Sequence, residues 1–321
     1  MSAAQRWGMT VPLEGLPLTR QADVARELED LGYTDLWTAE GMGTDGFTPL
    51  AVAAAVTSTV HLGVAVAPAF TRGPALLAQT AATMVATAPG RFTLGIGASS
   101  DVIVQQWNGI PYERPLSRCR DLLRFLRTVL AGNQADHRYE TFAVHGFRLG
   151  VVPDPPPRLL LAGLRDKMLG LAGAEADGAV LNWISADDVA RVVPQVHAGG
   201  PGKEVVARIL VAPTADAEHA RAVGRRLITA YLNVPVYRAF YVALGRDDLE
   251  PMWKLWADGD RRGAVDAVPD HVVDQLVVHG SPEECREHVR RFVDRGVTVP
   301  VAHLLPVGVD PLQACRDLAP R

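Results

Sequence analysis

Cysteine is scarce in this chain. Its 321 residues include three cysteines, Cys119, Cys285 and Cys315, which lie far apart and form no CxxC pair. A sparse and odd set favours reduced thiols over a disulfide framework or a thiolate zinc site. The nine histidines form no cluster with metal-ligand spacing either, so no metal site is expected.

Strong net charge and long apolar runs are also missing. The 32 Lys and Arg residues against 36 Asp and Glu residues give a formal net charge of -4, which is not the basic balance of a nucleic-acid-binding surface. No apolar run is long enough to span a membrane. The first ten residues lack the charged-then-apolar pattern of a signal peptide. These absences predict a cytoplasmic protein with no nucleic-acid or membrane partner.

Eight short apolar runs, nearly all followed by a helical pattern, are what the chain does contain. Each run is typical of a strand buried on both faces of a parallel sheet. Eight such units predict an α/β fold of the closed (β/α)8 kind, a TIM barrel, and 48% hydrophobic residues are ample for its core. The runs are Arg6–Val11, Thr34–Ala39, Val60–Ala67, Arg91–Gly97, Arg158–Ala162, Ala179–Asn182, Val206–Ala212 and Val299–Leu305.

Proline, glycine and capping residues mark where the helices begin and end. Proline starts two of them, a glycine follows the first, and a capping box starts the last. The expected helices are Leu18–Leu31, Pro49–Ser58, Pro74–Thr87, Ser117–Leu130 and one from Ser281 to about Arg295.

Two stretches exceed what a minimal barrel needs, within what is expected to be one domain spanning residues 1–321. Residues 133–157 follow the fourth helix and predict a hairpin of Tyr139–His145 and Phe147–Val151. Residues 214–296 lie between the seventh and eighth strands and predict several helices. Long insertions on barrels usually form lids or oligomer surfaces.

The C-terminal ends of the strands are where such barrels carry out their chemistry. Glu40 follows the second run, where a ligand contact and a purely structural carboxylate are equally supported. His303 near the end of the last run either faces the pocket or is a core histidine. The turn Gly163-Leu164-Arg165 either offers backbone N–H groups to a phosphate or is an ordinary βα turn. The sequence has no GxGxxG, HExxH, GxSxG or P-loop motif.

Several motifs follow one another in a specific order. They are Leu36-Trp37-Thr38-Ala39-Glu40, Phe47-Thr48-Pro49-Leu50-Ala51, Leu62-Gly63-Val64-Ala65-Val66, Arg72-Gly73-Pro74, Gly90-Arg91-Phe92-Thr93-Leu94-Gly95-Ile96-Gly97, Trp107-Asn108-Gly109-Ile110-Pro111-Tyr112, Ser117-Arg118-Cys119-Arg120 and Ala174-Glu175-Ala176-Asp177-Gly178. This order resembles that of the bacterial luciferase-like flavin and deazaflavin oxidoreductases, specifically the coenzyme F420-dependent branch. The resemblance is densest from Trp37 to Leu130 and fades through Thr214–Gly280.

The resemblance implies a barrel with F420 lying over the strand ends, with FMN as the alternative cofactor. It places a non-proline cis peptide behind the ring at Ala65-Val66. The other contacts that it implies are Gly163, Leu164 and Arg165 to phosphate, and Ala98, Ser99 and Ser100 to the cofactor tail or the rim of the ring.

One departure from the family pattern bears on the reaction. Alcohol-oxidising members carry an acidic residue followed by histidine after the second strand, and the matching pair here is Glu40-Gly41. Without that histidine, general-base catalysis from this position is lost, which favours reduction of an activated C=C or C=N bond. The proton would then come from Glu40, Tyr112, His303 or water.

Two other hypotheses stay open: a reduced-FMN monooxygenase of the same superfamily, and a barrel that has lost its cofactor. The expected partners are a small-molecule or modified-peptide substrate and a second copy of the chain in a homodimer. Large aromatic side chains are candidates for the wall of the substrate pocket. They are Trp7, Phe70, Trp107 and Trp183, with Tyr112 beside them.

Overall fold

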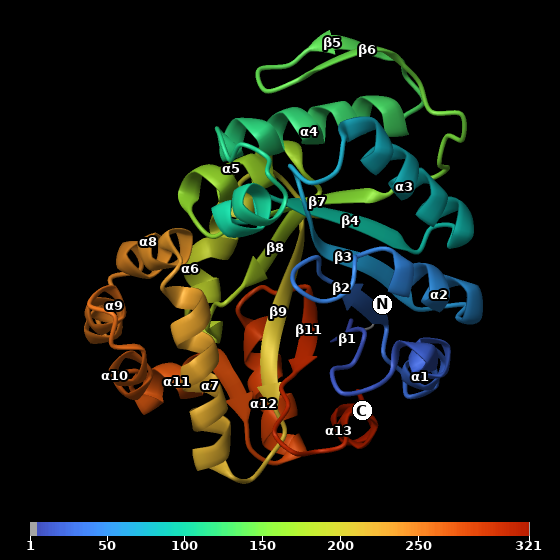
Figure 1. Ribbon diagram of the computed structural model, residues 1–321. Helices are drawn as coiled ribbons and strands as arrows, with labels where there is room; N and C mark the ends of the chain where they lie inside the picture. The colour runs from blue at the N-terminus through green and yellow to red at the C-terminus, as the bar shows by residue number, and fades with distance from the viewer. Residues whose placement is uncertain (1–4, 321) are drawn as a thin grey trace.

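The computed structural model describes residues 5–320 and has a closed parallel sheet at its centre (Figure 1). In order around the barrel the strands are β1 (Gly8–Thr10), β2 (Asp35–Thr38), β3 (His61–Pro68), β4 (Phe92–Gly97), β7 (Arg158–Ala162), β8 (Gly178–Asn182), β9 (Glu204–Ala212) and β11 (Val299–Leu304). The sheet closes because β1 pairs with β2 and β11, and β9 pairs with β8 and β11. All eight predicted runs are therefore barrel strands, and the (β/α)8 prediction is confirmed.

Helices surround this barrel and connect its strands (Figure 1). The predicted helix Pro74–Thr87 has those bounds, and both bonds of the predicted capping box at Ser281 are present. Within residues 5–320, none of the helices has the length and apolarity needed to cross a bilayer. The helices are α1 (Gln21–Asp30), α2 (Thr48–Val56), α3 (Pro74–Thr87), α4 (Pro115–Leu130), α5 (Asp166–Glu175), α6 (Ala186–His197), α7 (Ala217–Leu232), α8 (Pro235–Ala243), α9 (Glu250–Ala257), α10 (Arg261–Asp266), α11 (Asp270–Leu276), α12 (Pro282–Asp294) and α13 (Pro311–Leu318), with 3-10 and π turns at Leu18–Arg20 and Val102–Trp107.

The first insertion forms a hairpin over α4, as expected, but its strands are not the predicted ones (Figure 1). They are β5 (Ala135–Arg138) and β6 (Ala143–Phe147), so the predicted bounds were wrong. The reason is a contact with α4, because the Asp121 carboxylate accepts hydrogen bonds from the backbone N–H and the hydroxyl of Thr141, at 2.9 and 3.0 Å. These bonds make residues 139–142 the turn of the hairpin.

The second insertion contains α7 to α12 and a short strand that the sequence did not predict. This strand, β10 (Val277–His279), pairs in parallel with Leu210–Ala212 of β9, beyond the residues of β9 that pair with β8. β10 follows α11 directly and has three residues, which is too short to give a strand pattern of its own in the sequence. The insertion bulges from one side of the barrel, as its orange helices show in Figure 1.

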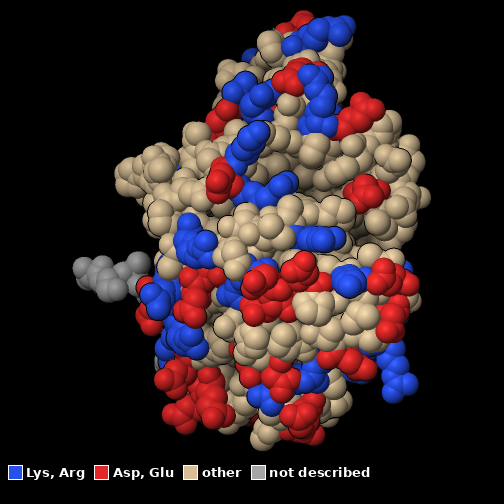
Figure 2. Space-filling view, turned by 90° about the vertical axis from the view of Figure 1, so that its left-hand side faces the viewer, with Lys and Arg blue, Asp and Glu red and all other residues tan. Residues whose placement is uncertain are grey.

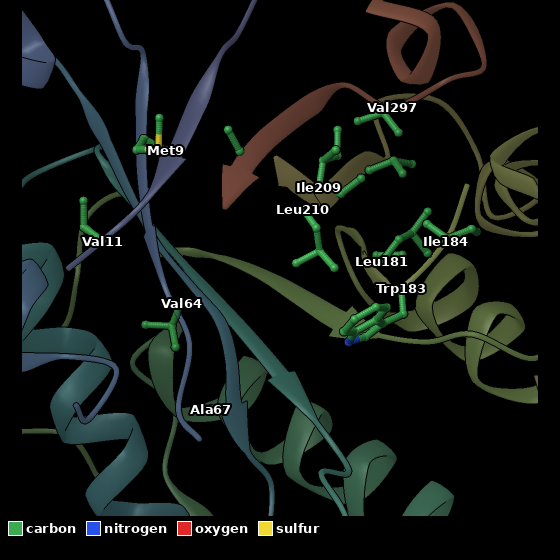
Figure 3. Packing of buried hydrophobic residues seen from close by; sticks show 14 of the residues in the cluster. Met9, Val11, Val64, Ala67, Leu181, Trp183, Ile184, Ile209, Leu210 and Val297 are labelled. Carbon is green, nitrogen blue, oxygen red and sulfur yellow. The ribbon is translucent and has the colours of Figure 1, made fainter. Parts of the chain in front are cut away.

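Outward-facing strand residues form most of the core, between the barrel and its helices. Met9, Val64 and Leu181 point away from the barrel axis and are buried. Figure 3 shows this packing, with Leu181 beside Ile184 and Trp183 at the end of β8. Figure 2 shows the face on the left-hand side of Figure 1. Acidic and basic side chains are mixed on this face, as expected for a net charge of -4.

The middle of the barrel interior is apolar and filled by one large side chain. Trp37 points inward from β2 and is 1% exposed. A Cβ on Gly63 of the neighbouring strand would lie 2.3 Å from the Trp37 ring, so glycine makes room for the indole. The other side chains of this layer are Leu160, Val180, Val206, Val299 and Val301. The barrel is therefore closed below the strand C-termini.

The N-terminal end of the barrel holds a buried network of charged groups. Arg6 donates hydrogen bonds to Asp35, with Nε to Oδ2 at 3.0 Å, and to Glu204 at 2.7 Å. The Asp35 side chain is fully buried. His61 Nε2 lies 2.7 Å from Thr93 Oγ1, and burial, then the charge of Arg6, lowers the pKa of His61 to about 4. Arg6, Asp35 and Glu204 thus form one ion-paired group, as expected for the stabilising end of a TIM barrel.

Glu29 at the end of α1 provides a pH-dependent stabilising contact. Its carboxylate accepts hydrogen bonds from the backbone N–H groups of Ser58, Thr59 and Val60, the shortest at 2.6 Å. Burial alone would raise the pKa of Glu29, but these bonds outweigh it and lower the pKa from 4.5 to about 2. The stabilisation is thus complete above pH 4.5 and is lost as the pH falls towards 2.

We expect Glu29→Gln to lower the free energy of unfolding by about 1.5–3 kcal/mol at pH 7, the range for a hydrogen bond to a charged group. The difference in the free energy of unfolding between this variant and the wild type should shrink as the pH falls from 4.5 to 2.5. Urea denaturation across this range measures it, and Asp30→Asn at the exposed neighbouring acid is the control. A loss of unfolding free energy that does not change with pH would contradict the assignment of this stabilisation to the Glu29 carboxylate.

Candidate functional site

A cavity of about 1290 Å³ lies over the C-terminal ends of the barrel strands. Residues at the ends of all eight strands line it, and the second insertion supplies part of its wall. Ligand cavities in proteins commonly measure 300–1,000 Å³, so this one has room for a cofactor ring and a second molecule. The position is the one at which TIM barrels carry out catalysis.

The cavity floor is lined by one residue at or near the C-terminal end of each strand, and it has two halves. On β2, β3, β4 and β7 these residues are small, and we call them the small half: Ala39, Ala65, Gly97 and Ala162. On β8, β9, β11 and β1 they are polar, and we call them the polar half: Asn182, Arg208, His303 and Thr10. A flat apolar surface therefore adjoins a cluster of hydrogen-bonding groups.

The small half combines close strand packing with an unusual backbone. The peptide between Ala65 and Val66 is cis, at the position that the family resemblance implied. A Cβ on Gly97 would lie 2.7 Å from the Val66 side chain and 3.1 Å from Ala162 Cβ. Glycine at 97 therefore keeps the floor flat beside the cis peptide.

One wall of the cavity is the turn between β7 and α5. Arg165 is the N-cap residue of α5, and in the described chain its side chain makes no capping hydrogen bond. The helix N-terminus therefore keeps N–H groups for an anion.

All eight residues predicted to contact the cofactor line this one cavity: Ala65, Val66, Ala98, Ser99, Ser100, Gly163, Leu164 and Arg165.

Glu40 lies at the rim of the cavity and is held by several donors. Arg72 forms an ion pair with its carboxylate, with Nη2 to Oε1 at 2.6 Å, and the Gly46 backbone N–H donates at 3.0 Å. The Arg72 guanidinium also lies 4.6 Å from the centre of the Phe47 ring. Glu40 thus orders the β2–α2 loop as well as lining the cavity.

Tyr112 and His303, the other two candidate catalytic residues, lie in different environments. The Tyr112 hydroxyl donates to the Ser99 backbone oxygen at 3.1 Å, and the ring packs against Phe70 behind the cavity wall. Burial raises the pKa of Tyr112 to about 12. His303 lines the cavity from β11, and burial, then the charge of Arg208, holds its pKa well below the ordinary value. The imidazole is therefore neutral at pH 7.

The four predicted pocket aromatics are not among the residues lining the cavity in the described chain. Trp7 and Phe70 are buried in the core, and Trp107 is 52% exposed on the surface. Trp183 lies one layer behind the wall, with its ring centre 5.1 Å from that of Tyr231. Tyr231 lines the cavity, as do Tyr237 and Phe240 from the same insertion.

The cysteines take no part in this site. All three are free and buried, and burial raises the pKa of Cys119 and of Cys285 to about 12. Among residues 5–320, no group of three or more His, Cys, Asp and Glu side chains could hold a metal ion.

The fold and this cavity define an enzyme of the TIM-barrel class with its ligand site at the strand C-termini. Residues 2–299 match the family model described as luciferase-like monooxygenase, and the chain belongs to this family. It is 27% identical over 296 residues to a 5,10-methylenetetrahydromethanopterin reductase of Archaeoglobus fulgidus, with 88% of each chain covered.

Solved structures show the same architecture. The F420-dependent tetrahydromethanopterin reductase from Methanopyrus kandleri superimposes with a TM-score of 0.81 at 19% identity, covering 99% of this chain and 98% of that one. An F420-dependent secondary alcohol dehydrogenase gives a TM-score of 0.80 at 17% identity, with the same coverage. At these identities the two structures establish the fold that they share with this chain.

Proposed function

We propose that this protein is an F420-dependent oxidoreductase that reduces an activated C=C or C=N bond. The observation that carries the proposal is the cavity floor, in which a flat small half adjoins a polar half within one space. Bound reduced F420 supplies a hydride, and the protein supplies binding, orientation and electrostatics. The names of the relatives support the choice of cofactor.

The residues of the cavity suit a deazaflavin. Ala65, Val66 and Ala162 would support the flat ring, because larger side chains there would occupy its space. Ser99 and Ser100 would contact its rim. The first turn of α5, with the Arg165 side chain beside it, would hold the phosphate, since helix N-termini bind anions through free N–H groups.

The surroundings of Glu40 favour reduction over alcohol oxidation. Oxidation of an alcohol needs a base for the hydroxyl proton, and the residue after Glu40 is Gly41 rather than a histidine. The Glu40 carboxylate is already engaged by Arg72 and Gly46. A secondary alcohol dehydrogenase shares the fold, so the assay must include both directions.

The first experiment is a binding titration of the purified protein with F420 and FMN, each oxidised and reduced. We expect F420 to bind at least about tenfold more tightly than FMN, a difference of about 1.4 kcal/mol. Absorbance and fluorescence of the bound cofactor report the binding. A preference for FMN would instead indicate a monooxygenase, with oxygen uptake as the next assay. Binding of neither cofactor would refute both enzyme hypotheses.

The proposal extends to the cellular setting. A small organic molecule or a modified peptide is the proposed substrate, and a homodimer in the cytoplasm is the proposed state. Sedimentation equilibrium of the purified chain tests the dimer, and a single species at the mass of one chain, 34.5 kDa, would refute it.

A further inference from the structure

Arg208 on β9 is a charged group without a counterion. Its Nε is buried with no hydrogen-bond partner, and no carboxylate between residues 5 and 320 forms an ion pair with its guanidinium. Arginine stays protonated in proteins, and a buried charge without a partner is costly. Arg6 at the other end of the barrel is bound by both Asp35 and Glu204. The described chain therefore provides no anion for Arg208, and a bound molecule would have to supply it.

The groups around Arg208 are polar and also incompletely bonded. Asn182 is its direct neighbour in the β8–β9 pairing. Asn182 Oδ1 and Thr10 Oγ1 are buried without a partner in the described chain. Burial raises the pKa of Tyr237 to about 12, although the Asn182 side chain partly lowers it, so the phenol keeps its proton at pH 7. These groups line the same cavity as Arg208, and they have hydrogen-bonding capacity that the described chain leaves unused.

Above the polar half, the wall of the cavity is mostly apolar. Val234, Val236, Phe240 and Leu244 of the second insertion line it. A ligand held here would thus have a polar end against Arg208 and an apolar body against α8 and the residues at its two ends. The small half belongs to other elements, the strands β2, β3, β4 and β7.

We infer that the polar half is the subsite for an anionic oxygen group of the substrate, of which a carboxylate is the simplest. The substrate would be an apolar molecule that carries this group near its reacting bond. Arg208 pairs with the anion, and Thr10, Asn182 and Tyr237 complete its hydrogen bonds. That the bound molecule is a substrate rests on the proposed function. The anion subsite itself is argued from Arg208 and its neighbours alone.

The test uses two fluorinated probes that share one apolar body and differ in the head group, which is an anionic carboxylate in one and a neutral hydroxymethyl group in the other. We would measure the binding of 4-(trifluoromethyl)cinnamate and of 4-(trifluoromethyl)cinnamyl alcohol by 19F NMR, with and without oxidised F420 bound. Hydrogen bonds to charged groups are worth enough for the carboxylate to bind about tenfold to hundredfold more tightly than the alcohol. Arg208→Met should bring this ratio close to one, and Arg208→Lys should restore part of it.

Arg191 provides a matched control, because it lines the same cavity but already donates to the Leu244 backbone oxygen at 2.7 Å. Arg191→Met should leave the ratio unchanged. Arg208→Gln replaces the Met variant if that variant does not fold. Equal binding of the two probes to the wild type, or an unchanged ratio in Arg208→Met, would overturn the inference.

The same variants separate this inference from the proposed function. If F420 binds but the probes bind equally, the proposed function stands and the anion subsite is refuted. If the carboxylate preference depends on Arg208 but F420 does not bind, the subsite stands and the cofactor proposal fails. If Arg208→Met weakens only reduced F420 and leaves the probe ratio unchanged, Arg208 serves the cofactor and the inference is overturned.

Discussion

Gly178→Ala is expected to prevent the barrel from closing. Gly178 pairs with Glu204 of β9 and with Leu160 of β7. A Cβ at position 178 would lie 1.9 Å from the backbone oxygen of Glu204 and 2.6 Å from its nitrogen. Backbone atoms of a paired strand cannot move aside as a side-chain tip can, so β8 and β9 would have to separate. We expect a destabilisation of more than about 4 kcal/mol.

The measurement is the midpoint of thermal unfolding, with the fraction of protein recovered folded after expression. A loss of this size lowers the midpoint by about 6 °C or more for a chain of this length. Gly170→Ala is the matched control, because Gly170 is exposed in α5 and a Cβ there meets no atom within 4 Å. That variant should gain up to about 1 kcal/mol from helix propensity. A Gly178→Ala protein with the wild-type midpoint would refute the clash.

The barrel could be predicted from the sequence because its signals are local. Each strand is a short apolar run, and Pro74 and Ser281 mark helix starts through their own backbone chemistry. The hairpin was placed wrongly because its turn depends on Asp121, twenty residues away. Nothing within residues 133–157 records that contact. The local sequence thus determines where an element exists more surely than where it turns.

The residues of the candidate site were likewise predictable where a local motif marks them, and not where distant elements form their surroundings. The cofactor positions follow strand ends and a glycine turn, which the order of motifs indicates. Arg208 was missed, although a charged residue amid the apolar run of β9 was a usable signal. Inward residues alternate along a strand, so Val206 in the barrel interior implies that Arg208 faces inward too. That Arg208 has no counterion could not be predicted, because its surroundings come from β8, β11 and the second insertion.

The four aromatic residues show the limit of composition as a guide to a pocket. Trp7 and Phe70 are large and apolar, which suits a core as well as a ligand wall, and the structure buries both. The aromatic side chains that do line the cavity, Tyr231, Tyr237 and Phe240, come from the insertion where the family resemblance fades. The substrate wall is therefore the part of the site least accessible from motifs.

Ala162→Phe is expected to abolish measurable F420 binding while leaving the fold intact. Ala162 is the last inward residue of β7, and it is partly exposed in the cavity. A phenyl group there would extend into the space proposed for the deazaflavin ring, since the floor below it is already filled. The dissociation constant should rise by about hundredfold or more, which corresponds to about 2.7 kcal/mol. Fluorescence titration with F420 measures it.

Ala243→Phe is the matched control, because Ala243 lines the same cavity but belongs to α8 of the second insertion rather than to the small half. The added ring has the same size, but position 243 is not among the residues proposed to contact the cofactor, so F420 affinity should change by less than about threefold, within about 0.7 kcal/mol. Equal unfolding midpoints would show that both variants are folded. If Ala243→Phe blocks F420 and Ala162→Phe does not, the deazaflavin ring lies against α8, and the assignment of the two halves of the floor is reversed.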